Sequence, residues 1–432
     1  MELKQQTKFK RTEIGMIPED WDVVKQKDVA RFINGRAYSY EEFRESGTPL
    51  VRIQNLTGTK EFVYSDLQLE EEKYIDEGDL IYAWSATFGP YIWKGPRTIF
   101  HYHIWKVICD EAKLDKFFFY YKLKHISNRI SDTGTGSIFT HITKKLMEDS
   151  QISLPPSISE QQSIAKILSD LDSKIELNQQ MNKTLEAIGQ AIFKHWFIDF
   201  EFPNEEGKPY KSSGGEMVYN EKLGKKIPKY WNVDNLGNHT IIKGRIGWKG
   251  LQVSEYTAEG PFIVGGLQIK DNRIMWEECS HITETRYEES PEIMLQESDI
   301  LMTKDGTIGK LAYVTSLPGK ATVAAHIHVI RKKTERVSQL FLYYFFKTKG
   351  FQNFVESRIS GSVVPALTQK NINGIPVVLP NSQILSQFDW VANYLQHKIA
   401  INSEISLMLT KIRDSLLPKL MLGKIRVPVP VN

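Results

Sequence analysis

The feature that most constrains the fold is a long amphipathic segment that occurs twice, at residues 159–197 and 382–422. A shift of 224 positions, the separation of Lys174 from Lys398, superimposes the two copies and also aligns Asn178 with Asn402. A helix that is apolar along one stripe needs a partner, and its own repeat is the best candidate. The stripe follows an a/d heptad pattern, with Ile167, Leu171, Met181, Leu185, Ile188 and Ile192 in the first copy and Val391, Leu395, Ile405, Leu409, Ile412 and Leu416 in the second.

The geometry of such helices predicts a long two-helix rod. A helix of about 38 residues is roughly 55–60 Å long. We expect the two copies to pair antiparallel within one chain, with a domain at each end and a pseudo-two-fold axis across the rod. A coiled coil between two chains is the alternative. Asn178 and Asn402 are interpreted as interior residues that fix register and orientation, and exposure at a fraying layer is the alternative.

The duplication continues outside the long segments. Each of these pairs is similar: residues 16–21 and 226–231, 78–81 and 298–301, 101–104 and 326–329, and 117–121 and 340–344. Strand patterns followed by helical patterns predict an α+β unit, present twice and separated by the antiparallel coiled coil. The expected segments are a first domain at 1–155, a long helix at 156–200, a linker at 201–225, a second domain at 226–380, a second long helix at 381–422 and a tail at 423–432.

Composition places the chain among ordinary globular proteins. Hydrophobic residues make up 41% and charged residues 25% of 432 residues, and the net charge of +3 permits a phosphate-bearing partner without requiring one. No run of about 18 apolar residues occurs, so no membrane span is expected. The amino terminus lacks the apolar core of a signal peptide. Cys109 and Cys279 form no disulfide or metal-ligand spacing, so a cytoplasmic location is expected.

The sequence carries no recognisable catalytic motif. Gly306–Lys310 has the wrong spacing for a phosphate-binding loop, and Leu154–Ser157 lacks the Asn or Asp that precedes the prolines of amino-methyltransferases. A spatial Ser/His/Asp triad remains open as an alternative. On a strand, His101/His103 and His326/His328 would each present two imidazoles on one face. No third ligand is evident, so neither a metal nor a cofactor is predicted on this chain.

Cations, amides and hydroxyls gather in glycine-containing loops of both domains. Lys and Arg neutralise phosphates, and Arg, Asn, Gln, Ser and Thr read base edges, so these loops are candidates for binding DNA. A solvated loop surface is the alternative for each single residue. The candidates are Arg36, Arg52, Gln54, Asn55, Trp84, Ser85, Lys94, His101, Thr135 and Ser137 in the first domain, and Arg245, Lys249, Lys304, Lys310, His326 and Ser362 in the second.

The assembled features resemble the specificity (S) subunits of type I restriction-modification systems. The resemblance covers the whole chain and is carried by residues 154–202, 208–231 and 384–425, with GMIPEDW at 15–21 and GDLIYAW at 78–84. It implies a non-catalytic subunit in which each target-recognition domain reads one half of a bipartite asymmetric site on double-stranded DNA. There are two alternatives. One is a coiled-coil scaffold whose two end domains bind proteins rather than DNA, and the other is a DNA-recognition protein fused to an enzymatic activity without a recognisable motif.

The resemblance also implies partners. The helices would set the spacer and dock two modification (methyltransferase) subunits, which carry S-adenosylmethionine, while restriction-translocase subunits use ATP and Mg²⁺. The residues implied for the helix seam and docking are Ile167, Leu171, Asn178, Leu185, Ile188, Leu395, Asn402, Leu409, Ile412 and Leu416. Glu176, Gln180 and Lys183, opposite the seam, are further docking candidates, for which a solvated face is the alternative.

Overall fold

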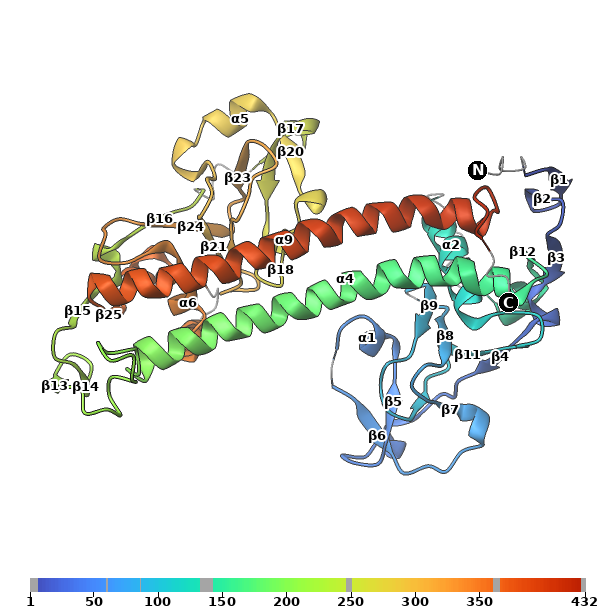
Figure 1. Cartoon of the computed structure of the whole chain (residues 1–432), viewed down its shortest axis with the longest axis horizontal. Helices are drawn as coiled ribbons and strands as arrows, with labels where there is room; N and C mark the ends of the chain where they lie inside the picture. Colours follow the sequence, from blue (N-terminus) through green and yellow to red (C-terminus); the bar gives the residue numbers. More distant parts are fainter. Residues whose placement is uncertain are drawn as a thin grey trace. The chain divides into compact units, whose positions relative to one another are not determined.

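The computed structural model of the chain describes residues 7–59, 61–85, 87–132, 143–245, 251–359 and 366–428. Its contacts divide the chain into two compact units. Unit 1 comprises Met1–Leu177 and Ile405–Asn432, and unit 2 comprises Asn178–Glu404. Two long helices, α4 (Ile158–Phe193) and α9 (Ser382–Met421), therefore each contribute one part to each unit (Figure 1).

Unit 1 is built mainly from two four-stranded sheets. Their strand orders are β4-β11-β8-β9, which is antiparallel, and β6-β5-β10-β7, in which β5 and β10 are parallel. A hairpin, β1–β2, and the antiparallel pair β3–β12 complete the strands described. The bounds are β1 Phe9–Thr12, β2 Gly15–Pro18, β3 Asp22–Lys25, β4 Ala30–Asn34, β5 Thr48–Val51, α1 Ile53–Leu56, β6 Val63–Ser65, β7 Tyr74–Ile75, β8 Leu80–Ala83, β9 Gly89–Ile92, β10 Thr98–Phe100, β11 Ile104–Cys109, α2 Lys116–Asp132, α3 Lys144–Asp149 and β12 Gln151–Leu154.

Unit 2 has the corresponding arrangement. Its sheets have the orders β16-β24-β21-β22 and β20-β17-β23, with β17 and β23 parallel, and a small hairpin β18–β19 is added. The pairs β13–β14 and β15–β25 are antiparallel. The bounds are β13 Met217–Asn220, β14 Lys225–Pro228, β15 Asn232–Asn235, β16 Thr240–Lys243, β17 Tyr256–Val264, β18 Ile269–Lys270, β19 Arg273–Ile274, β20 Ser280–Ile282, α5 Glu284–Glu288, β21 Ile300–Thr303, β22 Leu311–Tyr313, β23 Ala321–Val323, β24 Ile327–Lys332, α6 Gln339–Phe346, α7 Lys349–Ile359, α8 Gln369–Asn373 and β25 Pro376–Leu379.

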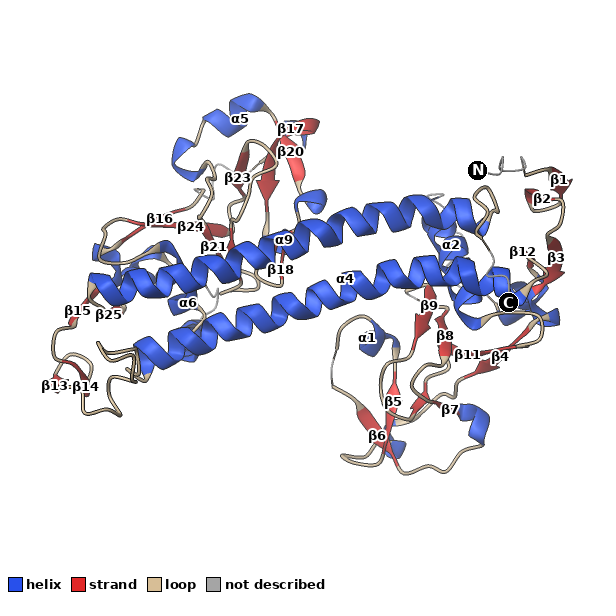
Figure 2. Cartoon of the chain, viewed as in Figure 1, coloured by secondary structure: helices blue, strands red, loops and turns tan. Residues whose placement is uncertain are grey.

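The common topology confirms the predicted duplication and the α+β class. In each unit a four-stranded antiparallel sheet has the same connectivity, and a parallel pair occupies the same place in the second sheet. Strands and helices occur together in both units, as Figure 2 shows. The two units are therefore two copies of one fold.

The strand register corrects the predicted alignment of the histidines. Tyr82 pairs with Trp105 in unit 1, and Met302 pairs with His328 at the same place in unit 2. His103 therefore corresponds to His326, two residues away from the expected match of His101 with His326. The repeated His-x-His pattern is a coincidence of spacing, because the sheet register aligns only one histidine of each pair.

The hydrophobic cores show that the two helices run antiparallel within each unit. The start of α4, with Ile164 and Leu168, packs in the unit 1 core beside Leu420 from the end of α9. In unit 2 the end of α4, with Phe193, packs beside Phe388 from the start of α9. Aliphatic and aromatic burial of this kind stabilises by about 1.5–3 kcal/mol per side chain, so helix pairing and domain folding depend on each other.

The helix seam differs from the predicted heptad positions. Ile188 and Ile412 are 42% and 48% exposed, and Met181 and Ile405 are also exposed. Asn178 and Leu395 are buried as predicted, and the rest of the buried line runs through Leu168, Ile175, Asn182 and Gly189 on α4 and through Ala392 and Ile399 on α9. Ile167, Leu171, Leu185, Asn402, Leu409 and Leu416 are partly buried.

The difference between the predicted seam and the buried residues of α4 and α9 has a physical cause. Each helix must cover both its partner helix and a globular domain, so its apolar pattern mixes two faces. In unit 2 the polar side chains make the seam specific: Asn182 Nδ2 donates to the Ile399 carbonyl at 3.3 Å and to Ser403 Oγ at 3.1 Å, and Asn402 Nδ2 donates to Asn182 Oδ1 at 3.0 Å. Asn178 Nδ2 donates to the Asn402 carbonyl at 3.4 Å.

The segment after α4 is packed rather than loose. The ring of Phe202 stacks on Trp231 at 4.7 Å and on Tyr210 at 4.5 Å between ring centroids, and Phe202 belongs to the unit 2 core. The glycine and proline content of residues 201–225 therefore marks turns on the surface of unit 2. Among the described residues, no helix is long and apolar enough to cross a membrane.

Candidate nucleic-acid interface

Four chain segments converge at one end of the sheets of unit 1: residues 35–36 after β4, 52–55 after β5, 84–85 after β8 and 101–103 before β11. Backbone hydrogen bonds hold them together, from Arg36 N to Phe100 O (3.2 Å), from Tyr102 N to Arg36 O (3.0 Å), from His101 N to Val51 O (3.0 Å) and from Trp84 N to His103 O (3.1 Å). We call these residues the unit 1 edge. It brings together Arg36, Arg52, Gln54, Asn55, Trp84, Ser85 and His101, which the sequence analysis selected one by one.

The unit 1 edge holds polar groups with unused hydrogen-bonding capacity. Nη2 of Arg36 contacts Glu42 Oε1 at 2.5 Å, and its guanidinium lies 5.1 Å from the Tyr38 ring centroid. Arg36 Nη1, Tyr38 Oη and Arg52 Nε are buried and make no hydrogen bond. Burial raises the pKa of Tyr38 to about 12, so its hydroxyl keeps its proton. Buried polar atoms are normally paired, so these three atoms are exceptions that single out this region of unit 1.

His101 is neutral at physiological pH. Burial, with smaller contributions from His103 and Arg52, lowers the pKa of His101 to about 4. An imidazole in this state offers one donor and one acceptor but no charge. His101 is therefore suited to hydrogen bonding with a base rather than to neutralising a phosphate.

Two candidates have structural tasks instead. The Asn55 side chain accepts from Arg52 N at 2.9 Å and donates to the carbonyls of Thr59 (3.2 Å) and Glu61 (2.8 Å), so it shapes the loop and leaves the neighbouring Gln54 exposed. Lys94 forms an ion pair with Glu176 on α4, away from the unit 1 edge. Thr135 and Ser137 lie outside the described residues.

Unit 2 forms the same edge from different residues. Ala324 N donates to Val264 O at 2.9 Å and Lys304 N donates to His326 O at 2.9 Å, as His101 and Trp84 do in unit 1. Gly265 N donates to Gln268 Oε1 at 3.1 Å, which reproduces the loop-capping bond from Arg52 N to Asn55. We call residues 244–245, 265–268, 304–305 and 324–326 the unit 2 edge.

Gly265, Gly266, Leu267 and Gln268 were missed by the sequence analysis. The signal was available, because Gln268 follows Val264 by four residues as Asn55 follows Val51. Leu267 is highly exposed at the position of Gln54. A Cβ on Gly265 would lie 2.8 Å from Gln268 Oε1 and one on Gly266 would lie 3.3 Å from Thr303 Cγ2, so the two glycines let the loop pack closely on these side chains.

The charges of the unit 2 edge are arranged differently. His326 is exposed and its Nδ1 lies 2.5 Å from Asp305 Oδ1, whereas His328 is buried and bonds the Leu367 carbonyl at 2.8 Å through Nε2. The two imidazoles therefore do not share an exposed strand face, contrary to the prediction. No group of three potential metal ligands occurs among the described residues.

Arg245 and the lysines complete the unit 2 edge. Arg245 is only 2% exposed, its Nε donates to Val323 O at 3.3 Å, and both Nη atoms lack hydrogen bonds. Burial and the nearby Arg286 lower its pKa. Lys304 and Lys310 are partly exposed on either side of the turn at 305–309. Lys249 and Ser362 lie outside the described residues.

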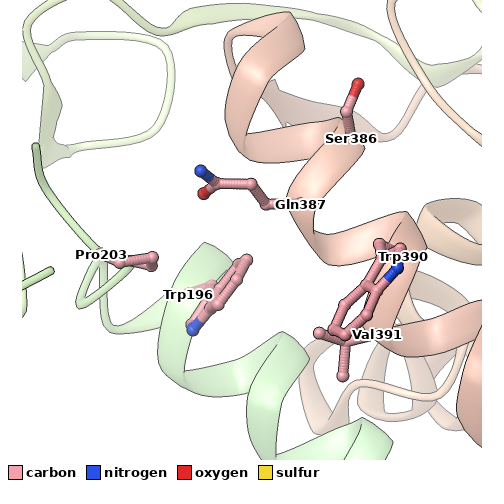
Figure 3. Close-up of a pocket in the computed structure, with 6 residues that line it drawn as sticks. All are labelled: Trp196, Pro203, Ser386, Gln387, Trp390 and Val391. Atoms are coloured by element: carbon pink, nitrogen blue, oxygen red, sulfur yellow. The ribbon is translucent and has the colours of Figure 1, made fainter.

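The helix pair exposes apolar side chains on its outer surface. In unit 2 these are Met181, Ile188, Tyr394 and Trp390, the last being 77% exposed, and in unit 1 they are Leu177, Ile405, Met408 and Ile412. At the end of the pair in unit 2 lies a hollow of about 430 Å³ lined by Trp196, Pro203, Ser386, Gln387, Trp390 and Val391 (Figure 3). The hollow, with Trp390 in its wall, is a local apolar surface of the kind that marks interaction sites.

Comparison with known proteins assigns the family. The profile described as type I restriction modification DNA specificity domain matches residues 18–187 and 252–404. The MjaIX specificity subunit of Methanocaldococcus jannaschii is 30% identical over 99% of this chain and 98% of its own length, and the MjaVIII specificity subunit of the same organism is 24% identical over 99% and 98%.

A solved structure shares the fold. The crystal structure of a type I restriction-modification S subunit from M. genitalium aligns with 99% of this chain and 100% of its own, with a TM-score of 0.55 and 17% identity. The chain therefore belongs to the type I restriction-modification DNA specificity subunits, the non-catalytic components that recognise the DNA sequence.

Proposed function

We propose that each unit reads one half of a bipartite asymmetric site on double-stranded DNA through its edge. The observation that carries the proposal is the construction of both edges on one strand register with different side chains. Unit 1 places Trp84, His101 and Tyr102 where unit 2 places Lys304, Ala324 and Ala325. Equal scaffolds with unequal contact residues are suited to reading two different half-sites, since base contacts specify sequence while the scaffold positions them.

The long helices supply the spacer and the docking surface. Half-sites that are read by two linked DNA-binding domains lie about one helical turn of DNA, ~10 bp, or a multiple apart. The exposed apolar residues of α4 and α9, together with the tryptophan-walled hollow, would receive two modification subunits. Those partners would bring S-adenosylmethionine, and restriction-translocase subunits would bring ATP and Mg²⁺, in the cytoplasm.

A domain exchange tests this proposal. Residues 16–150 are replaced by the matching residues of another specificity subunit, and the methylated sites are then mapped in a host that carries the partner subunits. One half of the recognised site should change, while the other half and the spacer stay as they were. A simultaneous change in both halves would show that one unit does not read one half-site.

A further inference from the structure

Unit 1 contains a column of parallel aromatic rings that leads from its core to its edge. Tyr82 and Trp105 are buried, and their rings are 5.9 Å apart with an interplanar angle of 17°. Trp84 continues the column at 5.8 Å and 18° from Trp105. The inner rings of the column, on β8 and β11, are therefore fixed by the hydrophobic core. Its outer ring, Trp84, is partly exposed at the unit 1 edge.

Tyr102 lies at the outer end of this cluster. Trp84 Nε1 donates to the Tyr102 carbonyl at 2.8 Å, and the Tyr102 ring lies 3.9 Å from His103 and 4.4 Å from His101 between centroids. Tyr102 nevertheless remains 40% exposed. Its backbone is fixed on both sides, because Tyr102 N also donates to Arg36 O at 3.0 Å. The Tyr102 ring therefore lies at the protein surface beside the rings of His101 and His103.

Unit 2 lacks this arrangement at the same register positions. Met302 replaces Tyr82, His328 replaces Trp105 and Lys304 replaces Trp84, as the pairing of β21 with β24 shows. Ala325, between Ala324 and His326, takes the position of Tyr102. At these positions the two edges therefore differ in chemistry, because unit 1 has the aromatic Trp84 and Tyr102 where unit 2 has Lys304 and Ala325.

We propose that Tyr102 stacks on a nucleobase of the half-site read by unit 1, whereas unit 2 reads its half-site without an aromatic contact at this position. This inference rests on the proposed DNA-reading function of the edges. Every base has a π-face on which an aromatic ring can stack. An uncharged ring neutralises no phosphate and releases no counterion, so the affinity that stacking adds depends little on salt. A ring that enters a base step must open it, which costs least at flexible pyrimidine–purine steps and at mismatches. The half-site of unit 1 should therefore contain a deformable step that faces Tyr102.

The test uses the chain assembled with its modification subunits and a duplex that carries the site found by methylome sequencing. Tyr102→Ala should weaken binding about tenfold or more, which corresponds to ~1.4 kcal/mol, and should leave the slope of affinity against salt concentration unchanged. Tyr102→Phe keeps the ring and should bind like the unaltered chain. Phe117→Ala removes an aromatic ring of similar exposure on α2, near the opposite end of β8, and should have no effect.

A DNA variant completes the cycle. Single mismatches are placed one at a time along the half-site of unit 1. A mismatch at the step on which Tyr102 stacks should tighten binding of the unaltered chain several-fold. The same mismatch should leave the affinity of Tyr102→Ala unchanged. Binding by Tyr102→Ala within twofold of the unaltered chain, or failure of Tyr102→Phe to restore it, would overturn the stacking inference. If the domain exchange already failed to change one half-site, the DNA-reading proposal itself would be wrong.

Discussion

Gly189 of α4 determines how closely the domain helix α6 can approach in unit 2. A Cβ placed on Gly189 would lie 2.5 Å from Cζ and 2.7 Å from Cε1 of Tyr344, and closer still to its hydroxyl. Tyr344 cannot move easily, because it is buried in the aromatic core and its Oη accepts from Gln396 Nε2 at 3.0 Å. Gly189→Ala must therefore displace a core side chain.

The expected cost follows from these contacts. Overpacking costs about 1–3 kcal/mol and a lost buried hydrogen bond about 1 kcal/mol, against a gain of about 1 kcal/mol in helix propensity. We expect a net loss of about 1–3 kcal/mol, measured by urea unfolding with linear extrapolation. Gly350→Ala on α7, where a Cβ meets nothing within 4 Å, is the matched control and should lose no stability.

A second variant separates packing from other causes. Tyr344→Phe removes the atom closest to the new methyl group, so the double variant with Gly189→Ala should lose less stability than the two single losses add up to. A Gly189→Ala chain as stable as the unaltered chain would refute the close packing of α6 on α4. So would additive losses in the double variant.

Three further outcomes are expected. Burial lowers the pKa of Lys122 to about 7 in the folded chain, whereas the Lys122 ammonium of the unfolded chain stays protonated to about pH 10. The free energy of unfolding should therefore rise between pH 7 and 8.5. Urea unfolding at each pH measures this rise, and Lys122→Met should flatten it. Glu186→Gln leaves Lys347 buried without its carboxylate, which lies 2.6 Å from Nζ, and should cost about 3–5 kcal/mol, most of it recovered when Lys347→Met is added. Trp390→Ser should weaken association with the modification subunits at least tenfold in a sedimentation assay without changing the unfolding midpoint. Val253→Ser, which alters a highly exposed side chain away from α4 and α9, should change neither.

The duplication and its helices were predictable because they repeat over long, periodic segments. The seam was predicted one position away from several of its real residues, at Met181 rather than Asn182 and at Ile188 rather than Gly189. Hydropathy favoured the apolar neighbour in both cases. The structure places the polar or small residue inside, because Asn182 bonds across the helix pair and Gly189 admits Tyr344.

The loops of unit 1 were selected from residue chemistry, but their convergence came only from the sheet topology. Arg36, Arg52, Trp84 and His101 lie far apart in sequence and meet because the parallel pair β5–β10 and the antiparallel sheet end at one place. Sequence chemistry also could not assign Asn55 to loop capping or Lys94 to a helix contact, since both depend on backbone carbonyls and carboxylates brought close by folding.

The most direct test of one edge per half-site is the methylome of two point variants in a host with the partner subunits. Gln54→Ala alters an exposed side chain of the unit 1 edge, and Lys304→Ala alters the unit 2 edge. Each lost base contact costs about 1–3 kcal/mol of discrimination. Gln54→Ala should relax one half of the methylated sequence and Lys304→Ala the other, with the spacer unchanged in both. Relaxation of the same half by both variants, or of both halves by either one, would contradict the account.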